Sequence, residues 1–161
     1  MYVRVRCIAA DRVAAQLPAA IANGATDTID ASEVDLATAV RELTGGAGVD
    51  HGIEVVGKPA TIRAAYDATR RGGKVTLVGA AGMEESVTFP ALSLMVDGKT
   101  IQGSVYGASD PPRDIPVLAD LARRGLLDLE ALVTRRIGLD DVETAFTDMA
   151  AGRGARSVVC F

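Results

Sequence analysis

Short apolar runs of strand length alternate with segments of helical periodicity along most of this 161-residue chain. Residues 52–56 and 75–78 form nearly continuous apolar runs, which are typical of strands buried on both faces. Between them, residues 59–69 place Ile62 and Ala65 on one face of a helix. This alternation predicts a parallel sheet covered by helices, and therefore an α/β fold.

The same patterns predict the individual elements. Strands are expected over residues 3–10, 28–30, 51–56, 74–78, 86–89 and 100–105, and helices over 12–23, 36–44 and 59–69. Pro18 should kink the first helix or end it early, because proline removes a helical hydrogen bond. After Val105 the pattern changes to helices over 115–124 and 140–151, with short strands at 132–137 and 157–160.

Composition argues against several functional classes. A net charge of -4 and an isoelectric point near 5.0 leave no electrostatic basis for binding nucleic acid or an anionic membrane. No stretch approaches 18 apolar residues, and Arg4 and Arg6 interrupt the first apolar run, so neither a signal peptide nor a membrane span is expected. Cys7 and Cys160 lie at opposite ends of the chain and are expected to be reduced thiols in a cytoplasmic protein.

Asp11 closes the first apolar run. Dinucleotide-binding folds present a carboxylate to the ribose hydroxyls of a coenzyme in this way, with a glycine-rich phosphate turn about 20 residues upstream. Here the first glycine is Gly24, so that turn is missing. Asp11 could simply cap the following helix, or the chain could be a nucleotide-binding domain that starts at its second strand, and both roles are compatible.

Glycine follows two of the predicted strands, at Gly57 and Gly79. In an open parallel sheet, ligands lie beyond the carboxyl ends of the strands, and glycine there lets the backbone approach a planar ring. The alternative for each glycine alone is that it merely turns the chain after a strand.

Several blocks in order together resemble the carboxyl-terminal half of zinc-dependent, medium-chain alcohol dehydrogenases. They are GATD at residues 24–27, TGGAGVD at 44–50, EVVG at 54–57, RGGKV at 71–75 leading to VG at 78–79, GSVYG at 103–107 and RSVVCF at 156–161. The resemblance covers essentially the whole chain. It implies a truncated Rossmann-like domain over residues 1–106, without its first strand and glycine-rich turn, and a segment over 107–161 that in relatives returns to the catalytic domain.

The resemblance also implies coenzyme contacts. Asp11 would accept hydrogen bonds from both adenosine ribose hydroxyls, which implies NAD, because a carboxylate repels the extra phosphate of NADP. The other implied contacts are Val56 and Gly57 beside the adenine, Val78 and Gly79 under the nicotinamide, Ser104 and Tyr106 at the carboxamide, and Arg156 near the pyrophosphate. Gln16 stands where many relatives have a lysine, so one charge-assisted contact is expected to be lost.

Catalysis in the family needs a zinc ion held by cysteine and histidine ligands. This chain has one histidine, His51, with both cysteines far from it in sequence, so no metal ligand and no catalytic residue are expected. NAD binding should be weak, because the pyrophosphate has lost its helix N-terminus. The first hypothesis is the coenzyme-binding portion of an NAD-dependent alcohol dehydrogenase, inactive on alcohols or aldehydes unless the missing domain is supplied.

The second hypothesis is a non-catalytic module that dimerises, and a third is a misplaced start codon. Relatives dimerise through an edge strand matching Ser86 to Phe89, so a homodimer through unpaired backbone groups is expected. Without the first strand, the strand ending at Asp11 and the strand ending at Val56 either close up or flank a space that another chain fills. Apolar helix faces beyond residue 107 must then find a substitute partner or lie exposed.

Overall fold

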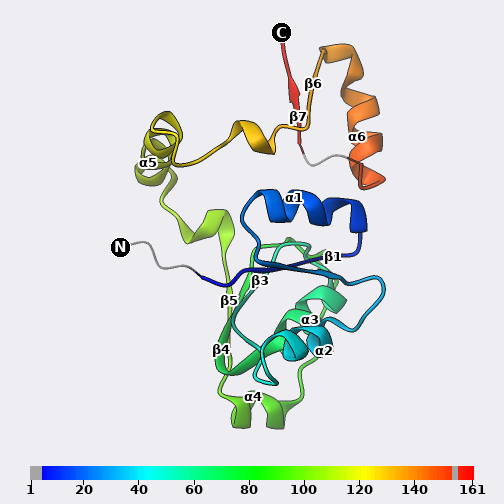
Figure 1. The fold of residues 1–161 in the computed structure, drawn as a ribbon, viewed down its shortest axis with the longest axis vertical. Coiled ribbons are helices and arrows are strands. Elements are labelled where there is room, and N and C mark those ends of the chain that lie inside the picture. The colour runs from blue at the N-terminus through cyan, green and yellow to red at the C-terminus, as the bar shows by residue number, and fades with distance from the viewer. Residues whose placement is uncertain (1–4, 154–155) are drawn as a thin grey trace. The chain divides into compact units, whose positions relative to one another are not determined.

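The computed structural model describes residues 5–153 and 156–161 and divides the chain into two compact units, Met1–Ser109 and Asp110–Phe161 (Figure 1). The predicted assignment of residues 1–106 to a coenzyme domain and of 107–161 to a returning segment stays a prediction. No helix among the described residues is long and apolar enough to cross a membrane.

The first unit alternates strands and helices, as the sequence predicts. Its elements are β1 (Ile8–Asp11), a 3-10 turn (Ala14–Gln16), α1 (Leu17–Ala22), β2 (Asp27–Asp30), α2 (Leu36–Leu43), β3 (Val49–Glu54), α3 (Pro59–Ala68), β4 (Thr69–Leu77), α4 (Ala91–Asp97), β5 (Thr100–Gly103) and a second 3-10 turn (Val105–Ala108). Every strand pair in this unit is parallel. The predicted α/β class, with parallel strands flanked by helices, is confirmed.

The core of the first unit joins its two sheets. Ile29 of β2, Ala37 and Val40 of α2 and Ala68 of α3 form a buried cluster, against which side chains from the starts of β1 and β3 also pack. Local sequence explains why α2 lies there, because the Asp35 carboxylate accepts a hydrogen bond from the Thr38 N–H and starts the helix. Ala37 and Val40, three residues apart, then face the cluster, together with Leu36, four residues before Val40.

The strands of this unit form two sheets, ordered β1–β2 and β3–β4–β5. Among the described residues β1 and β3 do not pair, so the expectation that they could close up against each other is wrong. Side chains of the shared core connect the sheets in place of a backbone ladder. That another chain supplies a strand between them stays a prediction.

The expectation that β3 is buried on both faces is also wrong. Gly52 faces α3, where an added Cβ would lie 2.8 Å from the Thr69 hydroxyl and 3.3 Å from the Ala65 carbonyl oxygen. Ile53, on the other face, is 68% exposed. Only one face of this strand is therefore covered, because α3 packs on a single side of it.

Two further local predictions need correction. Pro18 neither kinks α1 nor ends it, since it lies in the first turn, where its missing N–H has no helical partner in any case. Residues 86–89 form no strand, because they pair with no strand of the three sheets, and the helix that follows them, α4, was not predicted.

The second unit has little core of its own. It contains α5 (Pro111–Arg123), a 3-10 turn (Glu130–Leu132), β6 (Arg135–Ile137), a 3-10 turn (Leu139–Asp141), α6 (Val142–Ala150) and β7 (Ser157–Val159), with β6 and β7 parallel. Ile115 and Leu118 of α5, and Phe146 and Met149 of α6, are all at least half exposed. Leu121 and Val142 on the same helices are partly buried, so the expectation that these faces lie exposed holds only for part of them.

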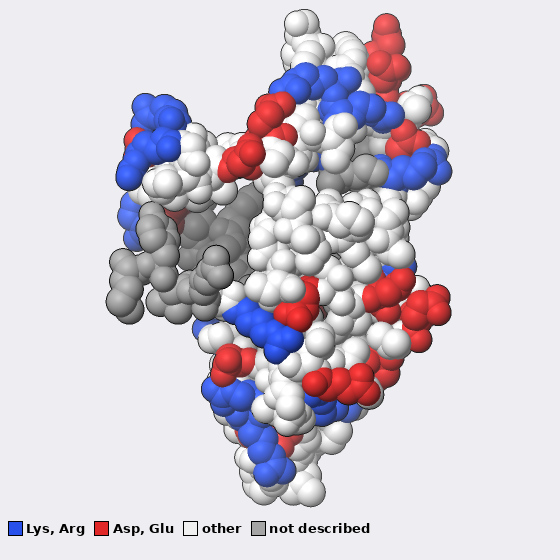
Figure 2. All heavy atoms as spheres, in the orientation of Figure 1, with Lys and Arg blue, Asp and Glu red and all other residues white. Residues whose placement is uncertain are grey.

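Charged side chains of both signs are interspersed on the face seen in Figure 2. Several basic side chains pair with acids, as in the Arg63–Asp67 bridge of α3 and the Arg70–Asp50 bridge between β4 and β3. The basic groups on the face drawn in Figure 2 therefore form no continuous basic surface.

Arg6 holds the start of β2 through a paired contact with Asp27. Its Nε and Nη2 groups each donate a hydrogen bond of 2.8 Å to one oxygen of the Asp27 carboxylate. The Arg6 guanidinium and then the Thr26 hydroxyl lower the pKa of Asp27 from 3.8 to about 2. In the unfolded chain this carboxylate takes up its proton nearer pH 3.8, so the folded state is favoured as long as Asp27 remains ionised.

We therefore expect a stabilising effect of Asp27 that is complete above its unfolded pKa and is lost as the pH falls towards about 2. Urea denaturation between about pH 5 and about pH 2 should show a flatter pH dependence for Asp27→Asn than for the wild type. Glu33→Gln, at an exposed acid, is the control. Parallel curves for wild type and Asp27→Asn would refute this role.

Candidate functional site

Five of the predicted coenzyme residues gather at one edge of the β3–β4–β5 sheet. Val56 and Gly57 follow β3, Val78 and Gly79 follow β4, and Ser104 follows β5. The last residues of these strands are register partners, Glu54 with Leu77 and Leu77 with Gly103. The three loops therefore begin side by side at the carboxyl edge, where ligands of open parallel sheets lie.

The two glycines of this edge bring the first two loops into direct contact. A Cβ on Gly57 would lie 2.5 Å from the carbonyl group of Ala80, and the φ of Gly57 is +77°. A Cβ on Gly79 would overlap the Gly57 nitrogen and lie 2.6 Å from Val56. Close contact between the loops thus requires glycine at both positions, and the predicted approach to a planar ring remains a prediction.

Apolar side chains flank this contact and are open to solvent. Val56 is 57% exposed and Val78 is 44% exposed. Large aliphatic groups at an open sheet edge offer a flat apolar surface, which suits the face of an aromatic ring.

The third loop carries the two residues predicted to contact the carboxamide. Ser104 is buried, and its N–H donates to the Leu77 carbonyl oxygen at 2.8 Å, which extends the ladder between β4 and β5. Tyr106 is 83% exposed and begins a left-handed run that continues through Gly107 and Ala108. Because left-handed backbone disfavours side chains with a Cβ, the tight turn after Ser104 is strained.

Asp11 ends β1 and therefore belongs to the other sheet. The Val13 N–H donates to its Oδ1 at 2.8 Å, so Asp11 shapes the turn that leads to the first helical residues without capping α1 itself. Its Oδ2 takes no part in that bond. The carboxylate is exposed, as a ribose ligand at a strand end must be.

A second acid ends the neighbouring strand beside it. Asp30 is the register partner of Asp11, and its Oδ1 accepts hydrogen bonds from the Ser32 hydroxyl and the Ser32 N–H. These bonds, the hydroxyl first, lower the pKa of Asp30. The carboxyl end of the β1–β2 sheet therefore carries two adjacent acids, which disfavour a phosphate group there.

Arg156 belongs to the second unit, whereas the other seven predicted residues belong to the first. It is exposed, and its backbone exchanges hydrogen bonds with Thr134 just before β7. A contact between its guanidinium and a pyrophosphate stays a prediction.

Two shallow hollows of the surface lie away from these residues. One is lined by Thr38 and Arg41 of α2 with Gly45 and Gly46 beyond it, and the other lies near Arg6, before β1. Neither is lined by a predicted coenzyme residue. The strand carboxyl edge remains the better candidate, because ligands of open parallel sheets lie at the carboxyl ends of the strands. The first hollow lies instead at the C-terminal end of α2.

The sequence reasoning missed Glu54, the last residue of β3. It is only 4% exposed, and its carboxylate accepts hydrogen bonds from the N–H groups of Val56 and Gly57 and from the Thr61 hydroxyl. One charge inside the otherwise apolar run of residues 52–56 was the available signal, since a buried charge must be hydrogen-bonded.

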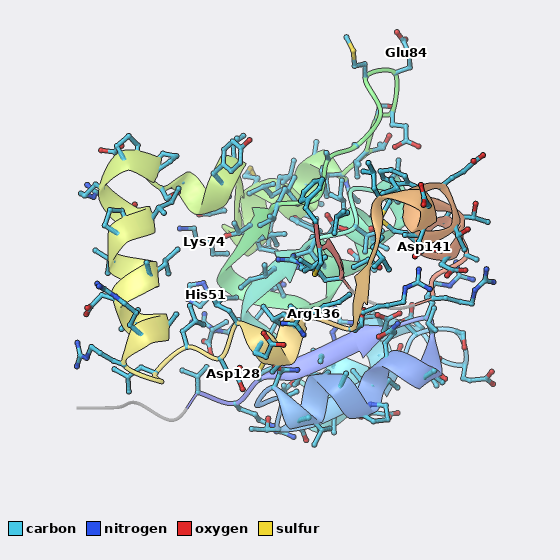
Figure 3. All side chains as sticks on the ribbon, turned by 90° about the horizontal axis from the view of Figure 1, so that it is seen from above. His51, Lys74, Glu84, Asp128, Arg136 and Asp141 are labelled. Carbon is cyan, nitrogen blue, oxygen red and sulfur yellow. The ribbon has the colours of Figure 1, made fainter. Side chains whose placement is uncertain are left out.

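The described residues do not fit a zinc site. His51 is exposed on β3, apart from both cysteines in the sequence, and is labelled in Figure 3. Cys7 and Cys160 are exposed free thiols that belong to different units. Within residues 5–153 and 156–161, no three His, Cys, Asp or Glu side chains are grouped so that they could hold a metal ion.

Comparisons with known proteins agree on one family. The family model for zinc-binding dehydrogenases matches residues 3–124. The chain is 31% identical to the S-(hydroxymethyl)glutathione dehydrogenase of Synechocystis over 157 residues, which are 96% of this chain and 42% of that protein. It is 30% identical to alcohol dehydrogenase-like 5 of Arabidopsis thaliana over 141 residues, 84% of this chain and 36% of that protein.

Solved structures show the same similarity. The benzyl alcohol dehydrogenase of Acinetobacter calcoaceticus superposes with a TM-score of 0.89 at 30% identity, over 96% of this chain and 42% of that one. An alcohol dehydrogenase zinc-binding domain protein of Burkholderia ambifaria superposes with a TM-score of 0.88 at 35% identity, over 96% and 41%. This chain thus spans about two fifths of the length of these relatives.

Proposed function

Because the chain belongs to the zinc-binding dehydrogenase family, we propose that it is the coenzyme-binding part of an NAD-dependent alcohol dehydrogenase. The observation that carries the proposal is the gathering of Val56, Gly57, Val78, Gly79 and Ser104 at one carboxyl edge of a parallel sheet. When bound, NAD would supply the acceptor for a hydride from an alcohol.

The residues present suit a dinucleotide. The exposed side chains of Val56 and Val78 would cover the two flat rings, and the main-chain groups of Ser104 and Tyr106 would hold the carboxamide. Asp11 would accept hydrogen bonds from the ribose hydroxyls, and Arg156 would pair with the pyrophosphate. The N-terminus of α3 is a poor phosphate site, because the buried Glu54 carboxylate accepts a hydrogen bond from the Thr61 hydroxyl in its first turn and places a negative charge there.

We expect the isolated chain to bind NAD weakly and to bind NADP at least about tenfold more weakly, because Asp11 and Asp30 repel a 2′-phosphate. Asp11→Asn should weaken NAD binding by about tenfold or more, the loss of one hydrogen bond to a charged acceptor, and should narrow the difference between the two coenzymes. Calorimetric or NMR titration with each coenzyme measures this.

Glu84→Gln is the matched control, because Glu84 lies on a loop that projects away from the rest of the first unit in Figure 3. Absence of NAD binding by the wild type would refute the proposed function. Equal affinities for NAD and NADP, or an Asp11→Asn variant with wild-type affinity, would refute the role of Asp11.

We further propose that hydride transfer to or from an alcohol or aldehyde requires a catalytic domain that carries the zinc ion, because the described residues offer no zinc ligands. Pairing of two copies through residues 86–89 is proposed as well. Those residues lie outside the three sheets, so strand pairing could use their backbone, although the Thr88 carbonyl oxygen already accepts a hydrogen bond from Arg63. A cytoplasmic location stays a prediction.

A further inference from the structure

We propose that Glu54 is the positioning residue of the candidate coenzyme site, because it holds the loops after β3 and β4 in register with each other. The inference rests on the proposed function only for what these loops bind. Glu54 is not one of the predicted coenzyme contacts, and it would act through Val56, Gly57, Val78 and Gly79.

The side chain of Glu54 orders the first loop. Its Oε1 accepts hydrogen bonds of 2.9 Å from the Val56 N–H and the Gly57 N–H, and its Oε2 accepts a second bond of 3.1 Å from Gly57. The Thr61 hydroxyl donates to Oε1 at 2.7 Å. This loop therefore turns around a buried carboxylate.

The main chain of Glu54 orders the second loop. Its carbonyl oxygen accepts hydrogen bonds from the Val78 N–H at 2.8 Å and from the Gly79 N–H at 3.1 Å. The contact between Gly57 and Ala80 then locks one loop against the other. One residue thus bonds the backbone of all four positions predicted to line the adenine and the nicotinamide.

A helix cap would be the plainer role for this carboxylate, but the geometry differs from one. A cap accepts hydrogen bonds from N–H groups of the first helical turn. Glu54 instead accepts from Val56 and Gly57, which precede the cap residue Lys58, and α3 already starts with Pro59. The carboxylate therefore serves the loop first, and contacts the helix only through the Thr61 hydroxyl.

Glu54→Gln tests the proposal, because the amide keeps the size of the side chain but removes its charge and one of its two acceptor oxygens. Even if the amide oxygen takes the place of Oε1, its NH₂ group then faces the Gly57 N–H in place of Oε2. We expect amide hydrogen exchange at Val56 and Gly57 to become at least about tenfold faster, with exchange at Val75 unchanged. NAD titration should show at least about tenfold weaker binding. Glu84→Gln, on the projecting loop, should change neither measurement.

The two readouts separate the proposals. If the wild type binds no NAD, the proposed function fails, and local exchange alone decides whether Glu54 positions the loops. Equal acceleration of exchange throughout the unit, or none at Val56 and Gly57, would overturn the positioning role.

Glu54→Asp decides the matter if Glu54→Gln does not fold. It keeps the charge but shortens the side chain by one methylene, so faster exchange confined to Val56 and Gly57 is again required. A folded Glu54→Asp protein with wild-type exchange at both amides would reject the role, and so would the failure of both variants to fold.

Discussion

Replacement of Gly79 by alanine is expected to lower the free energy of unfolding by about 3 kcal/mol or more, at the upper end of overpacking effects. The added Cβ would overlap the Gly57 nitrogen and lie 2.6 Å from Val56. Both obstacles are backbone atoms, which cannot move aside as the end of a flexible side chain can. The loop after β4 must therefore separate from the loop after β3, or the end of the sheet must distort.

Urea denaturation of the variant measures this effect as a lower midpoint. Gly82→Ala is the matched control, because a Cβ there meets only the Glu85 side chain at 3.5 Å, an ordinary contact. It should shift the stability by about 0.5 kcal/mol or less. A Gly79→Ala midpoint equal to that of Gly82→Ala would show that the loops do not need their close contact.

Replacement of Tyr66 by alanine is expected to cost about 3 to 5 kcal/mol, the range for removing a large aromatic side chain from a core. Tyr66, on α3, is 1% exposed, and its ring centroid lies 4.8 Å from that of Phe89. The Lys99 ammonium lies 4.2 Å from the centroid of the Tyr66 ring. The variant would lose the ring contacts and leave a cavity between α3 and its neighbours.

Tyr106→Ala is the control for this experiment, since the same residue type is 83% exposed there and its truncation should be nearly neutral for stability. Tyr66→Phe removes only the hydroxyl that bonds Ser93 at 3.0 Å, and should cost about 1 kcal/mol. Denaturation midpoints of the three variants test this order. A Tyr66→Ala protein as stable as Tyr66→Phe would contradict the importance of the ring.

Lys99 depends on Tyr66 in a second way. The ammonium donates a hydrogen bond of 2.8 Å to the Tyr66 carbonyl oxygen and lies 3.9 Å from the Asp97 carboxylate. Burial lowers the pKa of Lys99, while the charge of Asp97 opposes that shift. The cation–π contact with the Tyr66 ring adds to these interactions and links α3 to the residue after α4 and Gly98.

Local sequence patterns determined much of the architecture. The alternation of apolar runs and helical periods predicted the order of β2 to β5 with α2 and α3 between them, because side-chain periodicity depends on near neighbours. Apolar residues three apart placed Ile62 and Ala65 on one helix face, and Ile62 is buried in the structure. The family was also apparent from blocks such as EVVG at residues 54–57, and the match over residues 3–124 confirms it.

Strand pairing depends on contacts between residues that are distant in the sequence, and it could be established only from the tertiary structure. Residues 86–89 have the pattern of a strand, yet no neighbouring strand is placed to pair with them in the described chain. β1 and β3 likewise lie in separate sheets that a shared side-chain core connects, which the pattern of neither strand alone could show.

The candidate site shows the same division. Sequence alone indicated glycines at two strand ends, since glycine is informative wherever it follows an apolar run. It did not show that Gly57 and Gly79 meet each other, nor that the Glu54 carboxylate holds the loop that contains Gly57. Hydrogen bonds and close contacts form between groups that folding brings together, so only the folded chain determines which of these residues act as a unit.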